Sequence, residues 1–250
     1  MTSDAARISV TAKISAYYRK FSDIAFAAEV ATLLGADEAF AEIVREHALE
    51  PDKLTFCAPM FEARYKSITQ LIGECGATQV LELASGYSLR GLDLTQTSSL
   101  HYVETDLCDV VATKLDLLED VRRRHNIAPR PLHAVTVADV LELGQLQIAA
   151  ADFDRGRPLV ILCEGLVGYL TREETGCLAR NVHSLLSEFT GGCWIVPRVQ
   201  DGDSELATRE DPAPRGRHRG HPASARCFGV RGRQRSRGLS PPCWFRHAGL

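Results

Sequence analysis

Short apolar runs alternate with helix-like stretches between residues 77 and 198, and this alternation constrains the fold more than any other feature of the chain. The apolar runs are nearly continuous, which is typical of strands covered on both faces of a parallel sheet. The stretches between them are long enough to return the chain across the sheet as helices. The pattern predicts an α/β fold with a mostly parallel sheet, with strands over residues 79–83, 100–105, 132–137, 158–163 and 193–197 and helices over residues 88–96, 110–124 and 171–188.

The predicted helix over residues 110–124 is amphipathic. Its apolar side is expected to face the sheet and consists of Val111, Leu115, Leu118 and Val121. Its charged side is expected to face solvent and consists of Lys114, Glu119, Arg122, Arg123 and Arg124.

The first predicted strand runs into a turn of small residues, Ala84-Ser85-Gly86, and then into a helix. A glycine at such a turn lets the backbone approach a ligand, and the first N–H groups of the helix are left available to bind it. An ordinary tight loop has the same sequence pattern. The turn alone therefore leaves a ligand site and a plain connection both open.

Acidic residues occur at the ends of four predicted strands. They are Glu82, Glu104 and Asp106, Asp139 and Glu164. The acids of the second strand lie about 20 residues after the turn, where doubly wound folds place the carboxylate that binds ribose hydroxyls, and either of them suits this role. Each acid alone is more often a cap or a solvated residue. Together, at one edge of one sheet, they favour a cationic or polyhydroxyl ligand.

The N-terminal part of the chain is predicted to be helical over residues 11–75. Ser22 or Asp23 is expected to cap a helix that stops at Gly35, and Asp37 to cap the next helix. A third helix follows Pro59 and carries an apolar face. Arg64 lies within that face, so its guanidinium needs an anionic partner, either a structural carboxylate or the carboxylate of a ligand.

The net charge of −3 conceals two different kinds of sequence. Residues 1–200 carry 19 Lys and Arg against 27 Asp and Glu, whereas residues 201–250 carry 10 against 5 and are rich in Pro and Gly. The eight cysteines form no C-x-x-C pair, so we expect reduced core residues and no metal site. The chain has no apolar run long enough to span a bilayer and no signal-like start, from which we expect a cytoplasmic protein.

Several motifs in order carry a resemblance to a known family. They are Leu81 to Gly86 with Arg90-Gly91-Leu92, Tyr102 to Asp106, Glu164 to Thr171, and the opening Ile8 to Ala12 with Tyr18-Arg19 and Ser22-Asp23-Ile24. Over residues 8–198 the chain resembles the leucine carboxyl methyltransferase family of class I S-adenosylmethionine-dependent methyltransferases. Its nearer likeness is to the bacterial polyketide O-methyltransferase branch, of the tetracenomycin-synthesis type.

The resemblance implies a Rossmann-like class I methyltransferase fold and roles for particular residues. The methionyl carboxylate of S-adenosylmethionine would lie near Arg64 and Lys13, and the turn at Gly86 would lie beneath the methionyl and ribose groups, next to the strand that contains Glu82. Glu104 or Asp106 would bind the ribose, Asp139 and Val140 would hold adenine, and Glu164 would line the site beside the sulfonium.

The implied reaction is in-line transfer of a methyl group to a hydroxyl or carboxyl oxygen of a small-molecule acceptor, such as a polyketide. A carboxylate acceptor needs no general base. For a hydroxyl acceptor no base can be named, because the four histidines considered are scattered along the chain: His101, His125, His133 and His183. The catalytic residues are therefore left unassigned.

The chain is predicted to divide into a helical lid over residues 1–76, a cofactor-binding α/β core over residues 77–200 and a disordered tail over residues 201–250. Class I methyltransferase sheets end in an antiparallel hairpin, and the tail lacks the pattern for two long strands, so these strands are expected to be missing. We hypothesise that the tail is an out-of-frame translation of a GC-rich gene, which resequencing tests.

Two other functions fit parts of the sequence. Without its last strands the chain could be a non-catalytic S-adenosylmethionine-binding module. Alternatively, the Arg-Gly dipeptides of the tail could bind RNA, although the tail has neither regular repeats nor interleaved aromatic residues. Both rank below the enzyme.

Overall fold

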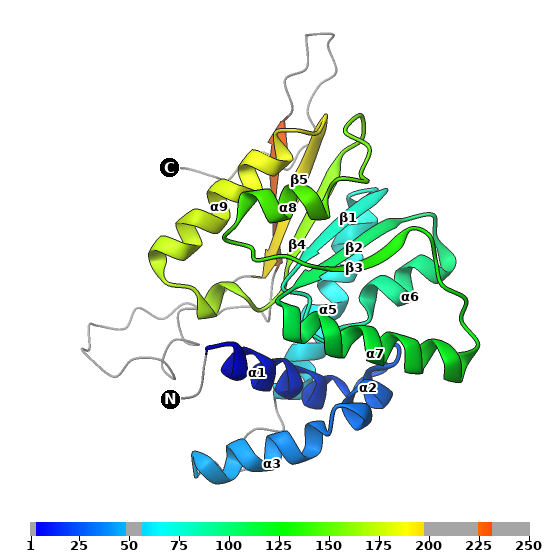
Figure 1. Cartoon of the computed structure of the whole chain (residues 1–250), viewed down its shortest axis with the longest axis vertical. Coiled ribbons are helices and arrows are strands. Elements are labelled where there is room, and N and C mark those ends of the chain that lie inside the picture. Colours follow the sequence, from blue (N-terminus) through cyan, green and yellow to red (C-terminus); the bar gives the residue numbers. More distant parts are fainter. Residues whose placement is uncertain (1–3, 49–56, 198–224, 232–250) are drawn as a thin grey trace.

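The computed structural model describes residues 4–48, 57–197 and 225–231 of the 250-residue chain. The N-terminal helices are α1 (Asp4–Arg19), α2 (Ala27–Leu33), α3 (Ala36–Glu46) and α5 (Cys57–Glu74). The sheet is built from β1 (Gln79–Leu83), β2 (His101–Asp106), β3 (His133–Val137), β4 (Leu159–Cys163), β5 (Gly191–Pro197) and β6 (Ala225–Arg231). Between the strands lie α6 (Arg90–Thr97), α7 (Cys108–His125), α8 (Leu143–Ala149), the short 3₁₀ helix η1 (Val167–Tyr169) and α9 (Arg172–Leu186) (Figure 1).

The strand order is β3-β2-β1-β4-β5-β6. Strands β1 to β5 are parallel, and β6 pairs antiparallel with β5. The winding direction reverses between β1 and β4, and doubly wound sheets bind their ligands beyond the carboxyl ends of the strands at such a point. The predicted mostly parallel α/β sheet is confirmed, and its topology directs attention to the ends of β1 and β4.

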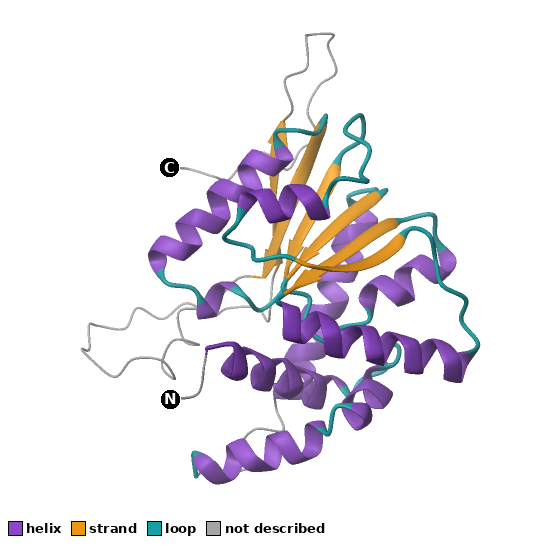
Figure 2. Cartoon of the chain, viewed as in Figure 1, coloured by secondary structure: helices purple, strands orange, loops and turns teal. Residues whose placement is uncertain are grey.

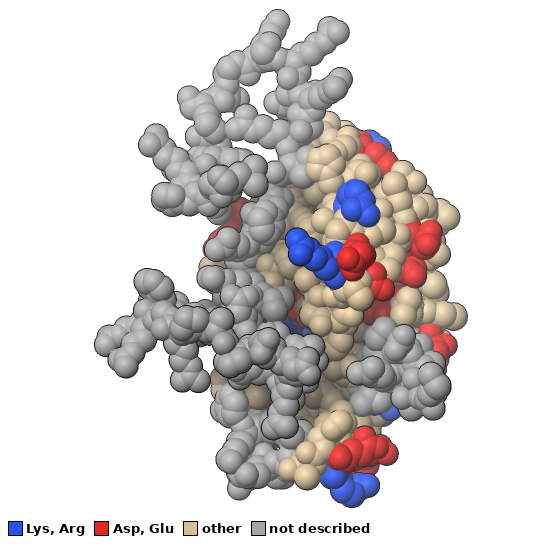
Figure 3. All heavy atoms as spheres, turned by 90° about the vertical axis from the view of Figure 1, so that its left-hand side faces the viewer, with Lys and Arg blue, Asp and Glu red and all other residues tan. Residues whose placement is uncertain are grey.

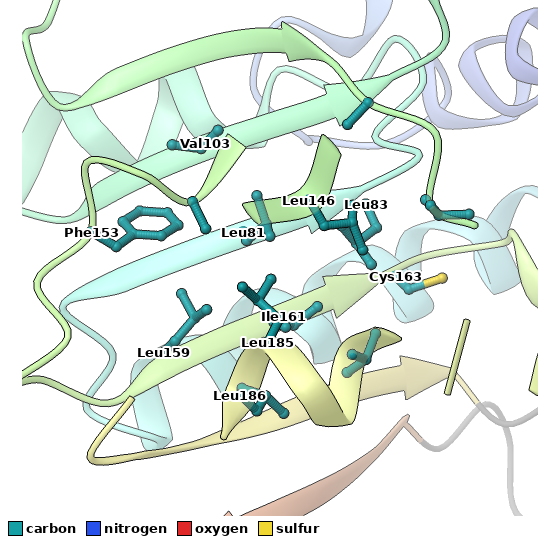
Figure 4. Packing of buried hydrophobic residues seen from close by; sticks show 14 of the residues in the cluster. Leu81, Leu83, Val103, Leu146, Phe153, Leu159, Ile161, Cys163, Leu185 and Leu186 are labelled. Carbon is teal, nitrogen blue, oxygen red and sulfur yellow. The ribbon is translucent and has the colours of Figure 1, made fainter. Parts of the chain in front are cut away.

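The two central strands are buried along their whole length, because apolar residues point to both faces of the sheet. On one face Leu81, Leu83 and Ile161 pack with residues of α8 and α9 (Figure 4). On the other face Val80 packs with Ile68 of α5 in a second cluster. Burying one such side chain contributes roughly 1.5–3 kcal/mol, so the core on both faces holds the strand ends in fixed positions.

Helices α1 and α2 cover the edge of the sheet toward which the parallel strands point, and α3 packs against them (Figure 2). Val30 of α2 and Leu118 of α7 belong to one buried cluster with residues of α1 and α6. Ala12 of α1 lies against the first turn after β1, with its Cβ 3.7 Å from the position that a Cβ at Gly86 would occupy. Helix α1 therefore closes over the carboxyl end of β1.

Helix α7 presents a different face to the sheet from the one expected. Lys114 was expected to face solvent and is fully buried, whereas Leu115 was expected to be buried and is 48% exposed. Buried positions of α7 recur at helical spacing through Val111, Lys114 and Val121. Lys114 is tolerated there because it has a buried anionic partner, which apolar periodicity alone does not reveal.

The expected helix caps are also wrong. Helix α2 begins after Phe26, and Ser22 instead donates a hydrogen bond to the carbonyl of Arg19 (2.6 Å) within the preceding turn. Helix α3 begins after Gly35, whose φ of +60° makes a sharp turn between the two helices, and Asp37 lies inside the first turn. Local side-chain bonding competed with capping at Ser22. The short α8 was not expected at all.

The tail supplies a strand that the sequence did not predict. Strand β6 pairs with β5 along its whole length, from Ala225 opposite Pro197 to Arg231 opposite Gly191. Two long strands were expected to be missing here, and the described residues include one, at residues 225–231, where Phe228 and Val230 favour extended backbone. The rest of the expected disordered tail lies outside the described residues.

Within the described ranges, no helix is both long and apolar enough to cross a membrane. The same part of the chain contains no group of three or more His, Cys, Asp or Glu side chains placed to hold a metal ion.

Candidate functional site

The turn after β1 is held by the end of β2. Gly86 has a φ of +53°, and its amide donates a 2.7 Å hydrogen bond to Oδ2 of Asp106. The other oxygen of Asp106 accepts a 2.8 Å hydrogen bond from the amide of Leu107. Burial raises the pKa of Asp106, and the two amides oppose that rise. A glycine turn and a carboxylate thus meet at the carboxyl edge of the sheet.

Glu164, which directly follows β4, lies among three arginines. Its Oε1 accepts hydrogen bonds from Arg19 (2.8 Å) and Arg64 (3.0 Å), and its Oε2 accepts one from Arg90 (2.6 Å). Burial disfavours the charged carboxylate, but the three guanidinium groups outweigh burial and hold the pKa of Glu164 well below its usual range. Arg64 therefore has the structural carboxylate that was one of its two expected partners.

Glu82 completes this arrangement from the middle of β1. Its Oε1 accepts a 2.7 Å hydrogen bond from Arg90, and its Oε2 accepts one of 2.6 Å from the hydroxyl of Tyr102. Burial raises the pKa of Glu82, and the adjacent Arg90 opposes that rise. Arg90 thus joins β1 to β4 through two carboxylates. We call the five charged residues the arginine cluster: Arg19, Arg64, Arg90, Glu82 and Glu164.

Glu104 belongs to a second buried network, one strand away. It is fully buried and accepts hydrogen bonds from Lys114 (2.8 Å) and from Nε2 of His133 (2.7 Å). Burial alone would raise its pKa, but Lys114 and His133 outweigh burial and lower the pKa of Glu104 to about 2. Lys114 also donates a 2.8 Å hydrogen bond to Ser85, so this network extends to the turn before Gly86.

The tautomer of His133 follows from its partners. Its Nδ1 lies 3.1 Å from an Arg122 nitrogen, which can only donate, so Nδ1 accepts and Nε2 carries the proton given to Glu104. A Cβ at Gly91 would lie 2.7 Å from this Nε2. Gly91 therefore makes room for the buried imidazole.

The remaining expected site residues lie apart from these networks. Asp139 follows β3 and accepts a 2.9 Å hydrogen bond from the amide of Leu141, which closes a local turn. Val140 is buried, and its carbonyl accepts a hydrogen bond from Asn181 (3.1 Å). Lys13 is half-buried on α1, next to the helix's contact with the Gly86 turn.

Among the residues of these networks that were not expected as site residues from the sequence are Arg19, Arg90 and Lys114. Arg19 and Arg90 occur in the sequence analysis only as parts of motifs, and the expected side of the helix is wrong for Lys114. A signal was present for Lys114, because it lies three residues after Val111 and so falls on the buried stripe. No local signal distinguishes Arg19 from a solvated arginine, because its partner is 145 positions away.

The histidines considered as bases have other surroundings. His133 is occupied in the Glu104 network, and His125 pairs with Glu29 (2.6 Å). His101 packs edge-to-face on Phe153, with ring centroids 4.7 Å apart, and His183 is exposed on α9. The partners of His133, His125 and His101 lie outside the arginine cluster and the Gly86 turn.

The described residues on the face shown in Figure 3 carry interspersed blue and red side chains. A polyanion-binding surface would gather positive charge instead. The four Arg-Gly dipeptides on which RNA binding was considered begin at Arg215, Arg219, Arg231 and Arg237. Apart from the backbone of Arg231 at the end of β6, they lie outside the described residues.

Comparison with known proteins finds relatives of this chain. A "Putative S-adenosyl-L-methionine-dependent methyltransferase" of Mycobacterium ulcerans (strain Agy99) is 29% identical over 160 residues, covering 63% of this chain and 48% of the relative. A protein of the same name from Mycobacterium marinum (strain ATCC BAA-535 / M) is 27% identical over 158 residues, with the same two coverages. The chain spans about half the length of these curated relatives.

Among solved structures, "a putative methyltransferase from Thermobifida fusca YX" aligns over 66% of this chain and 60% of its own, with 21% identity and a TM-score of 0.46. Residues 26–183 match the family profile described as leucine carboxyl methyltransferase. Because that match covers more than half of the 250 residues, the chain belongs to the leucine carboxyl methyltransferase family.

Proposed function

We propose that the carboxyl edge of β1, β2 and β4 binds S-adenosylmethionine and that the chain transfers its methyl group to an oxygen of a small-molecule acceptor. The contact between Gly86 and Asp106 carries this proposal, because it joins a glycine turn to a carboxylate beside the point where the strand order reverses. The family match supports the same cofactor. A polyketide-like acceptor and a cytoplasmic location stay predictions from the sequence.

The described residues fit the groups of this cofactor. Asp106 suits the ribose hydroxyls better than Glu104, because Asp106 lies at the strand end, whereas Glu104 has no exposed surface and already accepts hydrogen bonds from Lys114 and His133. Gly86 has no side chain, so the protein backbone at this turn can approach the ligand closely. The arginine cluster holds three positive and two negative charges, and this excess of one suits the methionyl carboxylate.

Each remaining expected residue keeps a proposed role. Arg64 is the most exposed arginine of the cluster, at 28%, and is assigned the methionyl carboxylate together with Lys13. Glu82 and Glu164 hold the arginines in position through hydrogen bonds, and Glu164 keeps its proposed place beside the sulfonium. Asp139 and Val140 follow β3 at the same edge and are assigned to adenine.

When bound, the cofactor would supply a methyl group activated by its positively charged sulfur, and the neutral thioether would be the leaving group when an acceptor oxygen bonds to the methyl carbon. The protein's part is to align the acceptor and to exclude water, and α1 is the segment placed to do so. None of the four histidines discussed above is placed as a base at this edge. We therefore favour an acceptor that is already ionised, such as a carboxylate, over a hydroxyl that must first lose a proton.

The test is methyl transfer from isotopically labelled S-adenosylmethionine to a panel of small carboxylic acids and phenols, read as labelled product and released S-adenosylhomocysteine. Asp106→Asn should lower the apparent cofactor affinity at least tenfold. Asp109→Asn, which changes an exposed acid three residues along, should leave it unchanged. Cofactor binding without transfer to any acceptor would favour the non-catalytic module.

A further inference from the structure

Two cysteines that are far apart in the sequence meet where the end of α5 packs on the sheet. Helix α5 covers the face of the sheet opposite α8 and α9 (Figure 1), and its Ile72 is buried in one cluster with Cys193 of β5. Cys75 directly follows α5, and its amide donates a 2.9 Å hydrogen bond to the carbonyl of Leu71. The sulfurs of Cys75 and Cys193 lie 3.7 Å apart, in hydrogen-bond contact. The fold therefore places these two thiols side by side.

The two thiols differ in their access to solvent. Cys75 is exposed, whereas Cys193 is only 8% exposed and packs among apolar residues such as Ile72 and Leu162. Oxidation of cysteine follows exposure, so a small oxidant in solvent reaches Cys75 first. Cys193 is then the second thiol, and it is already in contact with the first.

We propose that Cys75 and Cys193 are an oxidative modification site, at which a peroxide converts the two thiols into a disulfide. The Cys75 thiolate attacks one oxygen of hydrogen peroxide, the O–O bond breaks, and a sulfenic acid forms while the released hydroxide takes up the thiol proton as water. The Cys193 sulfur then attacks the sulfenic sulfur, the S–O bond breaks, and the hydroxyl leaves with the Cys193 proton as a second water. The two thiols are oxidised by two electrons in total, and the peroxide is reduced to two water molecules.

The bond requires only a small movement. A disulfide is about 2.05 Å long, so the two sulfurs must approach each other by less than about 2 Å. Cys75 can supply this movement because it lies beyond the last residue of α5 and its side chain is at the surface. Its neighbour Gly76 has a φ of +60° and turns the chain away from the helix, so the helix itself can stay in place.

The bond would join the end of α5 to β5 across 118 positions of the sequence. A cross-link that closes a long loop restricts the unfolded chain strongly, so the oxidised protein should be the more stable form. Cys193 lies in the first half of β5, toward the edge of the sheet away from the Gly86 turn. The site is therefore separate from the proposed cofactor site, and its test does not depend on cofactor binding.

The experiment treats the reduced full-length chain with stoichiometric hydrogen peroxide at neutral pH, blocks the remaining thiols with N-ethylmaleimide and maps the unreduced peptides by mass spectrometry. The wild type should yield a peptide pair linked through Cys75 and Cys193. Its thermal midpoint should rise by about 5 °C or more, and dithiothreitol should reverse the rise. Cys108→Ser removes the other exposed cysteine of the described ranges and should give the same link and the same rise.

Two variants separate the steps, with folding checked by circular dichroism. Cys75→Ser changes an exposed residue and should give neither the link nor the rise in thermal midpoint. Cys193→Ala removes the second thiol, so the sulfenic acid should persist on Cys75 and be captured by dimedone. The mapping of the wild type needs neither variant and stays decisive if one of them does not fold.

Three results would overturn the proposal. The first is a folded wild type in which peroxide forms no link between Cys75 and Cys193. The second is a link from Cys75 to a different cysteine of the chain or of a second molecule. The third is a linked wild type whose thermal midpoint does not rise.

Discussion

Replacing Lys114 with methionine should destabilise the protein strongly, although the sequence pattern places Lys114 on the side of its helix that faces solvent. The ammonium is fully buried and donates 2.8 Å hydrogen bonds to Glu104 and Ser85. Methionine fills a similar volume but cannot donate, so Glu104 keeps only His133 as a partner. The variant thus leaves the buried Glu104 carboxylate with one of its two hydrogen-bond donors and without the positive charge of Lys114.

The size of the effect follows from Glu104. Its pKa falls from an ordinary 4.5 to about 2 in the folded protein, which corresponds to about 3 kcal/mol of stability at neutral pH. Breaking a buried ion pair by removing one partner typically costs about 3–5 kcal/mol. Because domains are typically stable by only about 5–15 kcal/mol, Lys114→Met should lose a large share of the total.

Urea denaturation followed by circular dichroism, at pH values from 7 to 3, measures both the loss and its pH dependence. A depressed carboxylate pKa gives stability that is present above the ordinary pKa and lost as pH falls toward the folded value. The wild type should therefore lose the Glu104 contribution between about pH 4.5 and pH 2. The Lys114→Met variant lacks most of this contribution. The difference in free energy of unfolding between wild type and variant should therefore become smaller as the pH falls.

Two control variants separate the effect of losing the ion pair between Lys114 and Glu104 from the effect of losing a lysine. Lys66→Met removes an exposed lysine that pairs with Asp23 and Glu62 on the surface, and it should change stability little. The double variant Glu104→Gln/Lys114→Met should be more stable than Lys114→Met alone, because no unpaired charge remains. A loss below about 1 kcal/mol for Lys114→Met, or a difference that does not narrow at low pH, would refute the reasoning.

Three further predictions concern particular positions. Gly91→Ala should destabilise by about 1–3 kcal/mol in urea, because its Cβ would lie 2.7 Å from His133. Thr171→Ala should lower the thermal midpoint and cost about 1 kcal/mol, because Thr171 and Glu174 form a capping box at the start of α9. The thiol of Cys163 should resist a maleimide in the folded protein, because it is fully buried and burial raises its pKa to about 12.

Each of these has a contrasting position. Gly73→Ala should not destabilise, since nothing lies within 4 Å of its Cβ position. Thr171→Ser keeps a hydroxyl cap and should retain most of the stability. The exposed Cys108 should react readily with the maleimide. Equal losses for Gly91→Ala and Gly73→Ala would contradict the tight packing at Gly91. Equal losses for the two substitutions at Thr171 would contradict the helix cap, and equal reaction rates of Cys163 and Cys108 would contradict the burial of Cys163.

The sheet could be predicted from the sequence because its information is local. The apolar runs of β1 and β4 are buried at every position, and the predicted ends of the strands fall within two residues of the observed ones. Periodicity also placed the long helices. Periodicity failed to predict α8, which is only seven residues long. It also failed to predict β6, whose sequence has no regular apolar pattern and which is a strand through its pairing with β5.

The candidate site was predictable in position but not in detail. Strand ends and topology pointed to the correct edge, and the need of Arg64 for an anion was recognised from its place on an apolar helix face. The identity of that anion was not, because Glu164 lies 100 positions away. Lys114 was misplaced for the same reason: a buried charge is explained only by a partner, Glu104, that lies on another element.

The most direct test of the central claim is calorimetric titration of the folded wild-type chain with S-adenosylmethionine and with S-adenosylhomocysteine. The site at Gly86 and Asp106 predicts saturable binding of both ligands, with about one molecule of either per chain. The absence of saturable binding of either ligand to a chain shown to be folded would contradict the account.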